Sequence, residues 1–515
     1  MEKIQLLWAD DEIELLKPHI LFLTQKGYDI TTAKSGDEAL ELIKEKDFDA
    51  VLLDENMPGL SGLETLNRLK TMKSGLPIIM ITKSEEEYIM DDAIGSKIAD
   101  YLIKPVNPNQ IFLSLKKTLD NKRLISEKTT TEYRKDFRQI GMTLSDKLNF
   151  NEWADVFKKI VYWDLELDKS QDKSMLDVLK MQKTEANAQF FKFIEKNYIS
   201  WLNGKDAPNM SHTLFKNKII PEMDKSTSTF VLMIDNLRYD QWKIIEPIVT
   251  HYFKIDTEEI YCSILPTATQ YARNAFFAGL LPSEIEKRFP NWWLNDEHEG
   301  LKNQYEEDFL GEQLKRLGKN IKFSYNKITN LAAGKKLSDN LSNLTQNKLN
   351  VIVYNFVDML SHARTDMEVI RELADDEPAY RSITKSWFEH STLLDMVKQI
   401  AEKKCKLIIT TDHGTVLVKE ASKIVGDKNI NTNLRYKTGK TLEYNKKDVF
   451  EIKNPHDAFL PKQHVSSAYV FAKENMFFAY PNNFNYYANF YRNTFQHGGV
   501  SLEEMLIPYI ALSAK

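Results

Sequence analysis

Short apolar runs alternate with amphipathic stretches along the first 119 residues of the chain. The apolar runs are typical of buried strands and cover residues 3–9, 49–55, 76–82 and 99–105. The intervening stretches repeat their apolar residues at helical spacing, over residues 12–27, 36–46 and 62–73. This alternation predicts a doubly wound α/β fold, in which helices cover both faces of a parallel sheet.

The pattern changes twice further along the chain. Residues 121–207 contain no strand-like run, and the helical spacing in 153–167 and 174–202 predicts a helical bundle that serves as a connector. A second strand–helix alternation predicts a large α/β domain over residues 208–515. Its expected strands are residues 228–236, 348–358, 404–414, 468–475 and 505–513. We therefore expect three domains, with boundaries at 1–120, 121–207 and 208–515.

Composition narrows the class of protein. A length of 515 residues, with 42% apolar and 28% charged residues, suits a soluble protein of two or three domains. The net charge of -5 gives no basic field for binding duplex nucleic acid. Cys262 and Cys405 cannot form a disulfide framework, which fits a reducing compartment. With no signal-peptide pattern and no apolar run long enough to span a bilayer, a cytoplasmic location is expected.

Polar residues end several of the expected strands in the first segment: Asp10, Asp11, Asp54, Thr82 and Lys104. Open α/β sheets gather their sites at this edge. The carboxylates suit Mg²⁺, a hard cation that prefers oxygen ligands. Taken singly, an acidic turn or a solvated lysine would be the ordinary interpretation of each.

Together with "DENMPGLSG" from Asp54 and the Lys104-Pro105 pair, these residues resemble the receiver domain of two-component response regulators. The resemblance covers the first segment and implies that Asp54 is the phosphoacceptor. It implies a Mg²⁺ site formed by Asp10, Asp11, Asp54 and the backbone carbonyl of Asn56.

The same resemblance assigns a switch to three residues, Thr82, Tyr101 and Lys104. Tyr101 is also explained as an ordinary strand aromatic. Trp8 departs from the family pattern, because receivers commonly carry an aliphatic residue before the acid pair. No helix-turn-helix-sized basic segment follows residue 119, so no duplex-DNA-binding module is expected.

The third segment places possible metal ligands after four of its apolar runs: Asp235, Asp358, His362, Asp412, His413 and His497. Asp358 and His362 are four residues apart and can face one cavity from a helix. Mixed carboxylate and imidazole ligands favour Zn²⁺, Mn²⁺ or Fe. Singly, each residue could be a helix cap or a core histidine. Gathered acids without a cation would repel one another strongly.

Thr269 begins a stretch of helical period after Pro266. A hydroxyl at a helix N-terminus can be activated by a metal, and the backbone N–H groups beside it can bind phosphate. A threonine is also a good N-cap, so both interpretations stay open for this residue.

In order and spacing, these residues resemble the alkaline phosphatase superfamily and, more narrowly, its PglZ-type members. The resemblance implies two Zn²⁺ ions. The first ion would be bound by Asp235, Thr269, Asp412 and His413, and the second by Asp358, His362 and His497. We hypothesise hydrolysis of nucleotide or oligonucleotide phosphodiesters by double displacement, with Thr269 as the nucleophile.

Substrate contacts are less well defined by the sequence. The family's nucleotide phosphodiesterases commonly carry a Pro-Asn pair after the threonine motif, and this chain does not. Arg273 and Asn274 could contact the substrate phosphate or pack within the helix. Aromatic residues in 291–296 and 481–493 could stack on a base or serve packing.

The order of the three segments resembles response regulators of type IX secretion. The resemblance implies phosphorylation by a sensor histidine kinase, and a homodimer that forms on phosphorylation and controls the phosphodiesterase. The alternative is a metal-bound scaffold whose phosphorylation switches binding to a sigma factor or a secretion-motor protein.

Overall fold

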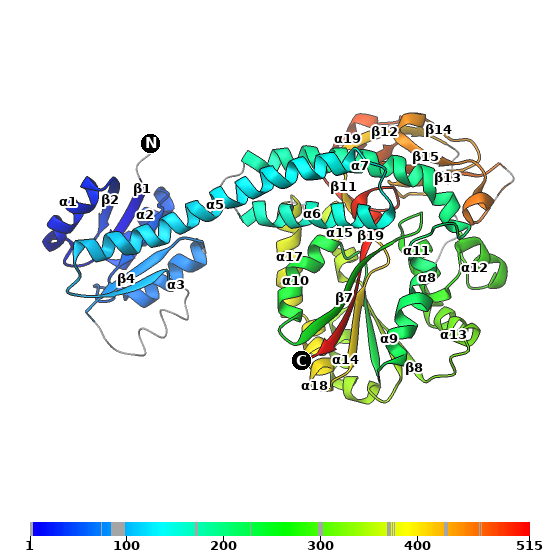
Figure 1. Cartoon of the computed structure of the whole chain (residues 1–515), viewed down its shortest axis with the longest axis horizontal. Coiled ribbons are helices and arrows are strands. Elements are labelled where there is room, and N and C mark those ends of the chain that lie inside the picture. The colour runs from blue at the N-terminus through cyan, green and yellow to red at the C-terminus, as the bar shows by residue number, and fades with distance from the viewer. Residues whose placement is uncertain are drawn as a thin grey trace. The chain divides into compact units, whose positions relative to one another are not determined.

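The computed structural model describes the chain at residues 4–73, 75–83, 98–169, 174–226, 228–296, 302–367, 372, 374, 376–426, 431–462, 464 and 466–515. The chain forms two compact units, and the division falls between Arg134 and Lys135 (Figure 1). No helix within these described ranges is long and apolar enough to cross a membrane.

A five-stranded sheet of order β2-β1-β3-β4-β5 forms the first unit. All its pairings are parallel. The strands are β1 (Ile4–Ala9), β2 (Tyr28–Ala33), β3 (Ala50–Leu53), β4 (Ile78–Thr82) and β5 (Asp100–Ile103). The doubly wound fold predicted from the sequence is confirmed, and β2 adds a strand that the apolar runs do not include.

The two faces of this sheet carry separate apolar cores. On β1, Leu7 and Ala9 belong to one core, and Leu6 and Trp8 belong to the other. This division follows from the alternation of side chains along a strand. The first core packs against α2 (Gly36–Glu45) and α3 (Gly62–Met72), and the second against α1 (Lys17–Gln25) and α5 (Pro108–Leu144).

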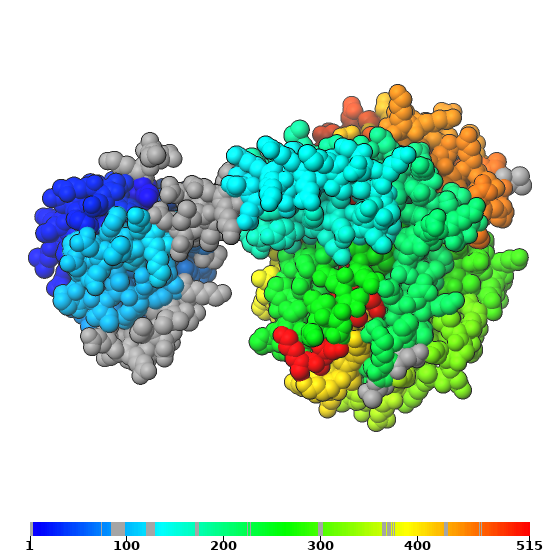
Figure 2. All heavy atoms as spheres, in the orientation of Figure 1, coloured from blue at the N-terminus to red at the C-terminus, as the bar shows by residue number. Residues whose placement is uncertain are grey.

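The connector is helical, as its apolar spacing predicts. Helix α5 continues to Leu144 and is followed by α6 (Phe150–Lys169) and α7 (Ser174–Leu202). Trp153 of α6 packs edge-on against Phe190 of α7, with ring centroids 5.4 Å apart. Helices α6 and α7 belong to the second compact unit, and their atoms form a continuous surface with it in Figure 2.

A six-stranded sheet of order β7-β19-β10-β6-β9-β8 forms the centre of the second unit. Its strands are β6 (Thr229–Ile234), β7 (Phe253–Cys262), β8 (Phe323–Ile328), β9 (Leu349–Tyr354), β10 (Lys406–Thr410) and β19 (Leu506–Ala514). Strands β8, β9, β6 and β10 run parallel, and β19 pairs antiparallel with β10 and β7. The large α/β domain expected from the sequence is therefore present.

The helices of this unit lie on both faces of the sheet (Figure 1). One group contains α10 (Tyr239–Val249), α17 (Glu377–His390) and α18 (Thr392–Glu402), which contact one another in sequence order. The other contains α8 (Ser211–Leu214), α11 (Thr269–Ala278) and α13 (Glu306–Arg316).

Parallel strands bring several predicted ligands to one edge of the sheet. Strands β6, β9 and β10 are almost wholly buried and end just before Asp235, Asp358 and Asp412. His497 arrives differently, because it follows β18 (Phe495–Gln496), which pairs with β11 (Val416–Leu417) outside the central sheet. The expected strand at 468–475 also lies outside this sheet, as β16 (Ala468–Ala472) between β13 (Tyr436–Gly439) and β15 (Val449–Ile452).

Candidate active site

The acids of the first unit meet at the carboxyl edge of its sheet. Oxygen atoms of Asp10, Asp11 and Asp54 lie within 4.8 Å of one another. Lys104 Nζ is 2.7 Å from Oδ2 of Asp10 and 2.8 Å from Oδ2 of Asp54. Burial raises the pKa of the Asp54 carboxyl, although Lys104 opposes the shift. Three oxygen donors beside one ammonium group suit a divalent cation and an added phosphoryl group.

The remaining predicted receiver residues lie around this cluster. Thr82 ends β4 and is fully buried, and its carbonyl accepts a hydrogen bond of 2.7 Å from the Lys104 amide. Tyr101 on β5 is partly buried against the core that contacts α2 and α3. Asn56 is exposed, two residues beyond Asp54. Their switch and magnesium roles remain predictions.

Gly62 allows α3 to start close to Asp54, which follows β3. A Cβ atom at this position would lie 2.4 Å from the carbonyl oxygen of Asp54 and 2.6 Å from Cα of Glu55. Ser61 caps the helix, forming a capping box with Glu64. The glycine therefore fixes the approach of a helix to Asp54.

In the second unit, a buried cluster forms around Asp412 and His413. Ligand atoms of Asp235, Asp412 and His413 lie within 4.8 Å of one another, and all three residues are at most 1% exposed. His413 Nε2 is 3.9 Å from Oδ1 of Asp235 and 3.8 Å from Oδ2 of Asp412. Thr269 Oγ1, at the start of α11, lies 3.1 Å from the same imidazole nitrogen. Four side chains thus converge on one point.

The carboxylates of this cluster fit a metal ion. Oδ1 of Asp235 and Oδ2 of Asp412 are buried, and neither accepts a hydrogen bond in the described part of the chain. Burial raises the pKa of Asp235 well above its usual value; Arg273 opposes the shift, and Asp412 adds to it. Burial acts in the same direction on Asp412, but His413 and Arg273 outweigh it and lower its pKa. A cation would offset the cost of burying these unpaired oxygens.

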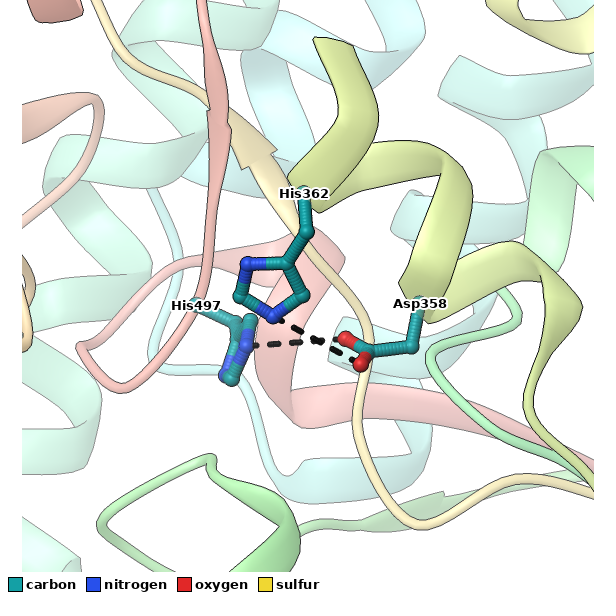
Figure 3. A group of neighbouring side chains, drawn as sticks. All are labelled: Asp358, His362 and His497. Carbon is teal, nitrogen blue, oxygen red and sulfur yellow. Dashed lines mark ion pairs between the residues drawn. The ribbon is translucent and has the colours of Figure 1, made fainter. Parts of the chain in front are cut away.

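A second cluster contains Asp358, His362 and His497 (Figure 3). Asp358 and His362 lie on α15 (Phe356–Asp366), and the nitrogen Nε2 of His362 is 3.5 Å from Oδ2 of Asp358. Nε2 of His497 is 3.8 Å from Oδ1 of Asp358. The His362 side chain is 65% exposed, so this cluster opens to solvent.

The tautomer of His497 follows from its backbone contact. Its Nδ1 lies 3.1 Å from the carbonyl oxygen of Thr267. Because a carbonyl only accepts, Nδ1 carries the proton, and the lone pair of Nε2 faces Asp358. Burial, together with His413 and His362, lowers the pKa of His497 well below its usual value. The neutral imidazole is the form that binds metals.

The two clusters form one site. The rings of His413 and His497 stack, with centroids 4.3 Å apart and an interplanar angle of 20°. Nδ2 of the Asn236 side chain donates a hydrogen bond of 3.4 Å to Asp358. The backbone N–H of Asn236 donates one of 3.4 Å to Asp412. Asn236 has a φ of 63°, a left-handed conformation that asparagine tolerates better than most residues. The seven side chains predicted as zinc ligands are thereby gathered in one place.

Arg273 and Asn274 lie behind this site and are each 1% exposed. Arg273 forms ion pairs of 2.8 Å with Asp235 and 2.7 Å with Glu306. Asn274 bonds to the carbonyl of Lys302 at 3.2 Å. These positions favour support of the ligands and of the helix over contact with a substrate phosphate. Sequence reasoning missed Glu306, because nothing in its local pattern distinguishes it from a surface helix residue.

The sequence also gave no signal for a buried ion network between the connector and the site. Lys183 of α7 lies 2.9 Å from Glu377 and 3.0 Å from Glu503. Arg238 lies 2.7 Å from both Glu377 and Asp240. Arg381 of α17 extends the network to α6, where it forms ion pairs with Asp164 and Asp168. The partners of the connector lie on α17 and on α20 (Leu502–Met505), and Arg238 follows β6. The connector therefore packs against elements that neighbour the predicted metal ligands.

The aromatic segments differ in exposure. Trp292 stacks between Phe289 and Tyr305, at 4.8 Å and 5.8 Å, and Trp293 is 4% exposed. Packing therefore accounts for the first segment. Tyr486, on α19 (Phe484–Tyr491), is 63% exposed and is available for contacts.

Three family models match the chain in order. The response regulator receiver domain matches residues 6–116, and the PorX response regulator linker domain matches 123–202. The BREX system PglZ alkaline phosphatase-like domain matches 214–512.

Curated relatives are similar to the N-terminal part. The transcriptional regulatory protein ZraR of Klebsiella oxytoca is 32% identical over 140 residues, 27% of this chain and 32% of that protein. The transcriptional regulatory protein ResD of Bacillus subtilis is 33% identical over 115 residues, 22% of this chain and 48% of that protein. The chain thus spans less than half the length of these relatives. Among solved structures, chemotaxis response regulator CheY4 of Vibrio cholerae is 27% identical, with a TM-score of 0.22, covering 23% of this chain and 100% of that one.

Fold, sites and matches define a two-component response regulator whose receiver domain is joined to a phosphatase-like output domain. The chain belongs to the PglZ alkaline phosphatase-like family, and its three matches in this order are those of a PorX-type response regulator. A receiver domain implies a phosphodonor such as a histidine kinase. The PglZ match indicates a hydrolase of the phosphatase superfamily.

Proposed function

We propose that the output domain is a zinc-dependent phosphodiesterase that uses Thr269 as its nucleophile, and that phosphorylation of Asp54 controls it. The observation that carries this proposal is the 3.1 Å distance between Thr269 Oγ1 and His413 Nε2, beside two carboxylate oxygens that lack hydrogen-bond partners in the described part of the chain. A structural zinc site needs only four closed ligands. A second ligand cluster and a hydroxyl are better explained by chemistry.

Asp235, Asp412, His413 and Thr269 would hold one Zn²⁺, and Asp358, His362 and His497 the other. Zinc bound there would lower the pKa of the threonine hydroxyl and neutralise charge on the phosphoryl oxygens. The Thr269 oxygen then attacks phosphorus, and the bond from phosphorus to the leaving alcohol breaks. Water later cleaves the phosphothreonine ester and regenerates the hydroxyl.

The surroundings support each part of this assignment. Thr269 is the first residue of α11, so the helix N-terminus adds backbone N–H groups beside the reacting phosphate. The exposed His362 leaves the second cluster open to solvent, where a long substrate can enter. We propose nucleotide or oligonucleotide phosphodiesters as substrates, by resemblance to family members.

Regulation is part of the proposal. A phosphoryl group on Asp54 would contact Lys104 and Thr82, and Tyr101 would move with them, so that receiver domains dimerise. By resemblance, the regulated process is type IX secretion, and a sigma factor or a secretion-motor protein would be a partner.

The test uses the full chain in three forms: as purified, stripped with chelator, and reloaded with Zn²⁺. We expect the reloaded protein to hydrolyse bis(4-nitrophenyl) phosphate and linear or cyclic oligonucleotides faster than 4-nitrophenyl phosphate, and the stripped protein to be inactive. Absence of turnover on every diester, with both metal sites filled, would support the non-catalytic scaffold instead. Faster hydrolysis of the monoester would contradict the diester assignment.

A further inference from the structure

A cavity of about 390 Å³ lies in the receiver domain beside the phosphoacceptor site. Its volume is in the range of small-molecule pockets, about 300–1,000 Å³. Apolar side chains of Leu16, Ile81, Pro105 and Val106 form most of its lining. All eight of its lining residues belong to the receiver domain, so binding there does not depend on the proposed phosphodiesterase.

Trp8 supplies a buried donor in this lining. Its side chain is fully buried, and Nε1 has no hydrogen-bond partner within the described residues. Leaving a buried N–H unpaired is destabilising. Because an aliphatic residue at this position would avoid that cost, the indole calls for an explanation other than packing.

His19 supplies an acceptor next to it. Its Nε2 lies 3.0 Å from the carbonyl oxygen of Val106, so Nε2 donates and, in the neutral ring, Nδ1 accepts. Nδ1 is buried and, across the described ranges, has no partner. The rings of Trp8 and His19 meet edge-on at 6.4 Å and 85°. Side chains in the lining of this apolar cavity therefore hold one unpaired donor and one unpaired acceptor among the described residues.

Two lysines add positive charge to the lining. The Lys83 side chain is 60% exposed and forms an ion pair of 2.7 Å with Glu12. It therefore lies where the cavity opens to solvent. Lys104 is 11% exposed and pairs with Asp10 and Asp54. A ligand near Lys104 would share this ammonium group with the phosphoacceptor.

We propose that this cavity binds a small planar aromatic acid. The ring would lie among Trp8, Leu16 and Val106, and a carboxylate oxygen would accept a hydrogen bond from Trp8 Nε1. Because Lys104 faces both the cavity and Asp54, binding and phosphorylation would be thermodynamically coupled. Coupling of this kind is reciprocal, so a phosphoryl group on Asp54 would change the affinity of the cavity by the same factor.

The test is ¹⁹F NMR of the full chain labelled with 5-fluorotryptophan, with naphthalene-2-carboxylate as the probe. The chain has eight tryptophans, and Trp8 is the only one before Trp153, so a Trp8→Phe variant assigns its resonance. We expect the probe to shift the Trp8 resonance saturably and to leave the others in place. The matched cation, naphthalen-2-ylmethylammonium, should have no saturable effect.

Two neighbouring substitutions separate the cavity from the surface. Leu16→Phe fills the cavity and should abolish the shift, whereas Leu15→Phe should leave it unchanged, because Leu15 is 73% exposed and does not line the cavity. An unmoved Trp8 resonance would mean that water alone occupies the cavity and would overturn the proposal. A shift that survives Leu16→Phe, or equal binding of the cation, would also overturn it. If Leu16→Phe displaced the Trp8 resonance without probe, Val106→Phe would serve as the cavity-filling variant instead.

Beryllofluoride on Asp54 should change the dissociation constant of the probe, and an identical constant would refute the coupling.

Discussion

Nη1 of Arg273 lies 2.8 Å from Oδ2 of Asp235, at a place where neither side chain reaches solvent. The ion pair engages one oxygen of this carboxylate and leaves Oδ1 without a hydrogen-bond partner among the residues that the structure describes. Glu306 balances the guanidinium from the other side at 2.7 Å. Arg273 therefore positions a metal ligand from behind.

Replacing Arg273 with Met should weaken zinc binding by about 10- to 100-fold, the usual effect of losing a residue that orients a metal ligand. Competition with a zinc-chelating dye measures the affinity. Arg288→Met on α12 (Pro282–Arg288) is the matched control, because Arg288 is exposed. Arg273→Lys keeps the positive charge but loses the forked arrangement of N–H donors. Its zinc affinity should therefore lie between those of the unsubstituted protein and of Arg273→Met. Unchanged zinc affinity in a folded Arg273→Met variant would argue against this role.

Lys183 should hold the connector on the output domain. Its ammonium group forms ion pairs with Glu377 and Glu503. Lys183→Met would remove this positive charge from both carboxylates. We expect a loss of roughly 3 kcal/mol in the free energy of unfolding of the output domain. Lys180→Met, one turn away, removes a lysine whose side chain is 65% exposed and should have almost no effect. Urea unfolding measures the stability of both variants. Equal free energies of unfolding would show that the ion pairs of Lys183 do not stabilise the output domain.

Lys437 gives a pH dependence whose sign is defined. Its side chain is 1% exposed, and burial lowers its pKa to about 7. The unfolded chain, with a lysine pKa of about 10.4, therefore binds more protons than the folded chain between these values, and stability falls as pH drops through that window.

Lys437→Met removes the cost of charging this group. We expect the variant to gain stability over the unsubstituted protein at pH 6.5, and the gain to be smaller by about 2 kcal/mol at pH 9. Calorimetry of the unfolding transition of the output domain at both pH values measures this difference in stability. Lys440→Met, at an exposed position, should show no such trend. A gain that does not vary with pH would show that Lys437 titrates normally.

Strand ends and helical spacing made much of the site predictable from sequence. Asp235, Asp358 and Asp412 follow buried parallel strands, and such strands end at one edge of a sheet. His362 follows Asp358 by four residues on a helix, which is a local relationship. Periodicity and residue type together predicted that these residues lie close to one another, and the family resemblance supplied their assignment as metal ligands.

Contacts between distant segments were not predictable in this way. The pairing of Lys183 with Glu503 depends on how α7 packs, and His497 reaches the site through a two-residue strand. Gly414 illustrates the difference. A Cβ atom there would lie 2.0 Å from the carbonyl oxygen of Glu503, a close approach that depends on how distant segments pack.

Phosphorylation should change the association state of the chain. Beryllofluoride with Mg²⁺ mimics a phosphoryl group on Asp54, and we expect it to convert monomer to dimer in sedimentation velocity. Asp54→Asn lacks the acceptor carboxylate and should remain monomeric under the same conditions. A monomeric beryllofluoride-treated protein at every accessible concentration would refute control by dimerisation.

Attack of the Thr269 oxygen on phosphorus is tested by the Thr269→Ala variant, with zinc content measured alongside turnover of bis(4-nitrophenyl) phosphate. We predict a fall in kcat on the order of a thousand-fold or more with both metal sites still filled, and partial activity in Thr269→Ser. Undiminished hydrolysis by zinc-loaded Thr269→Ala would show that Thr269 is not the nucleophile.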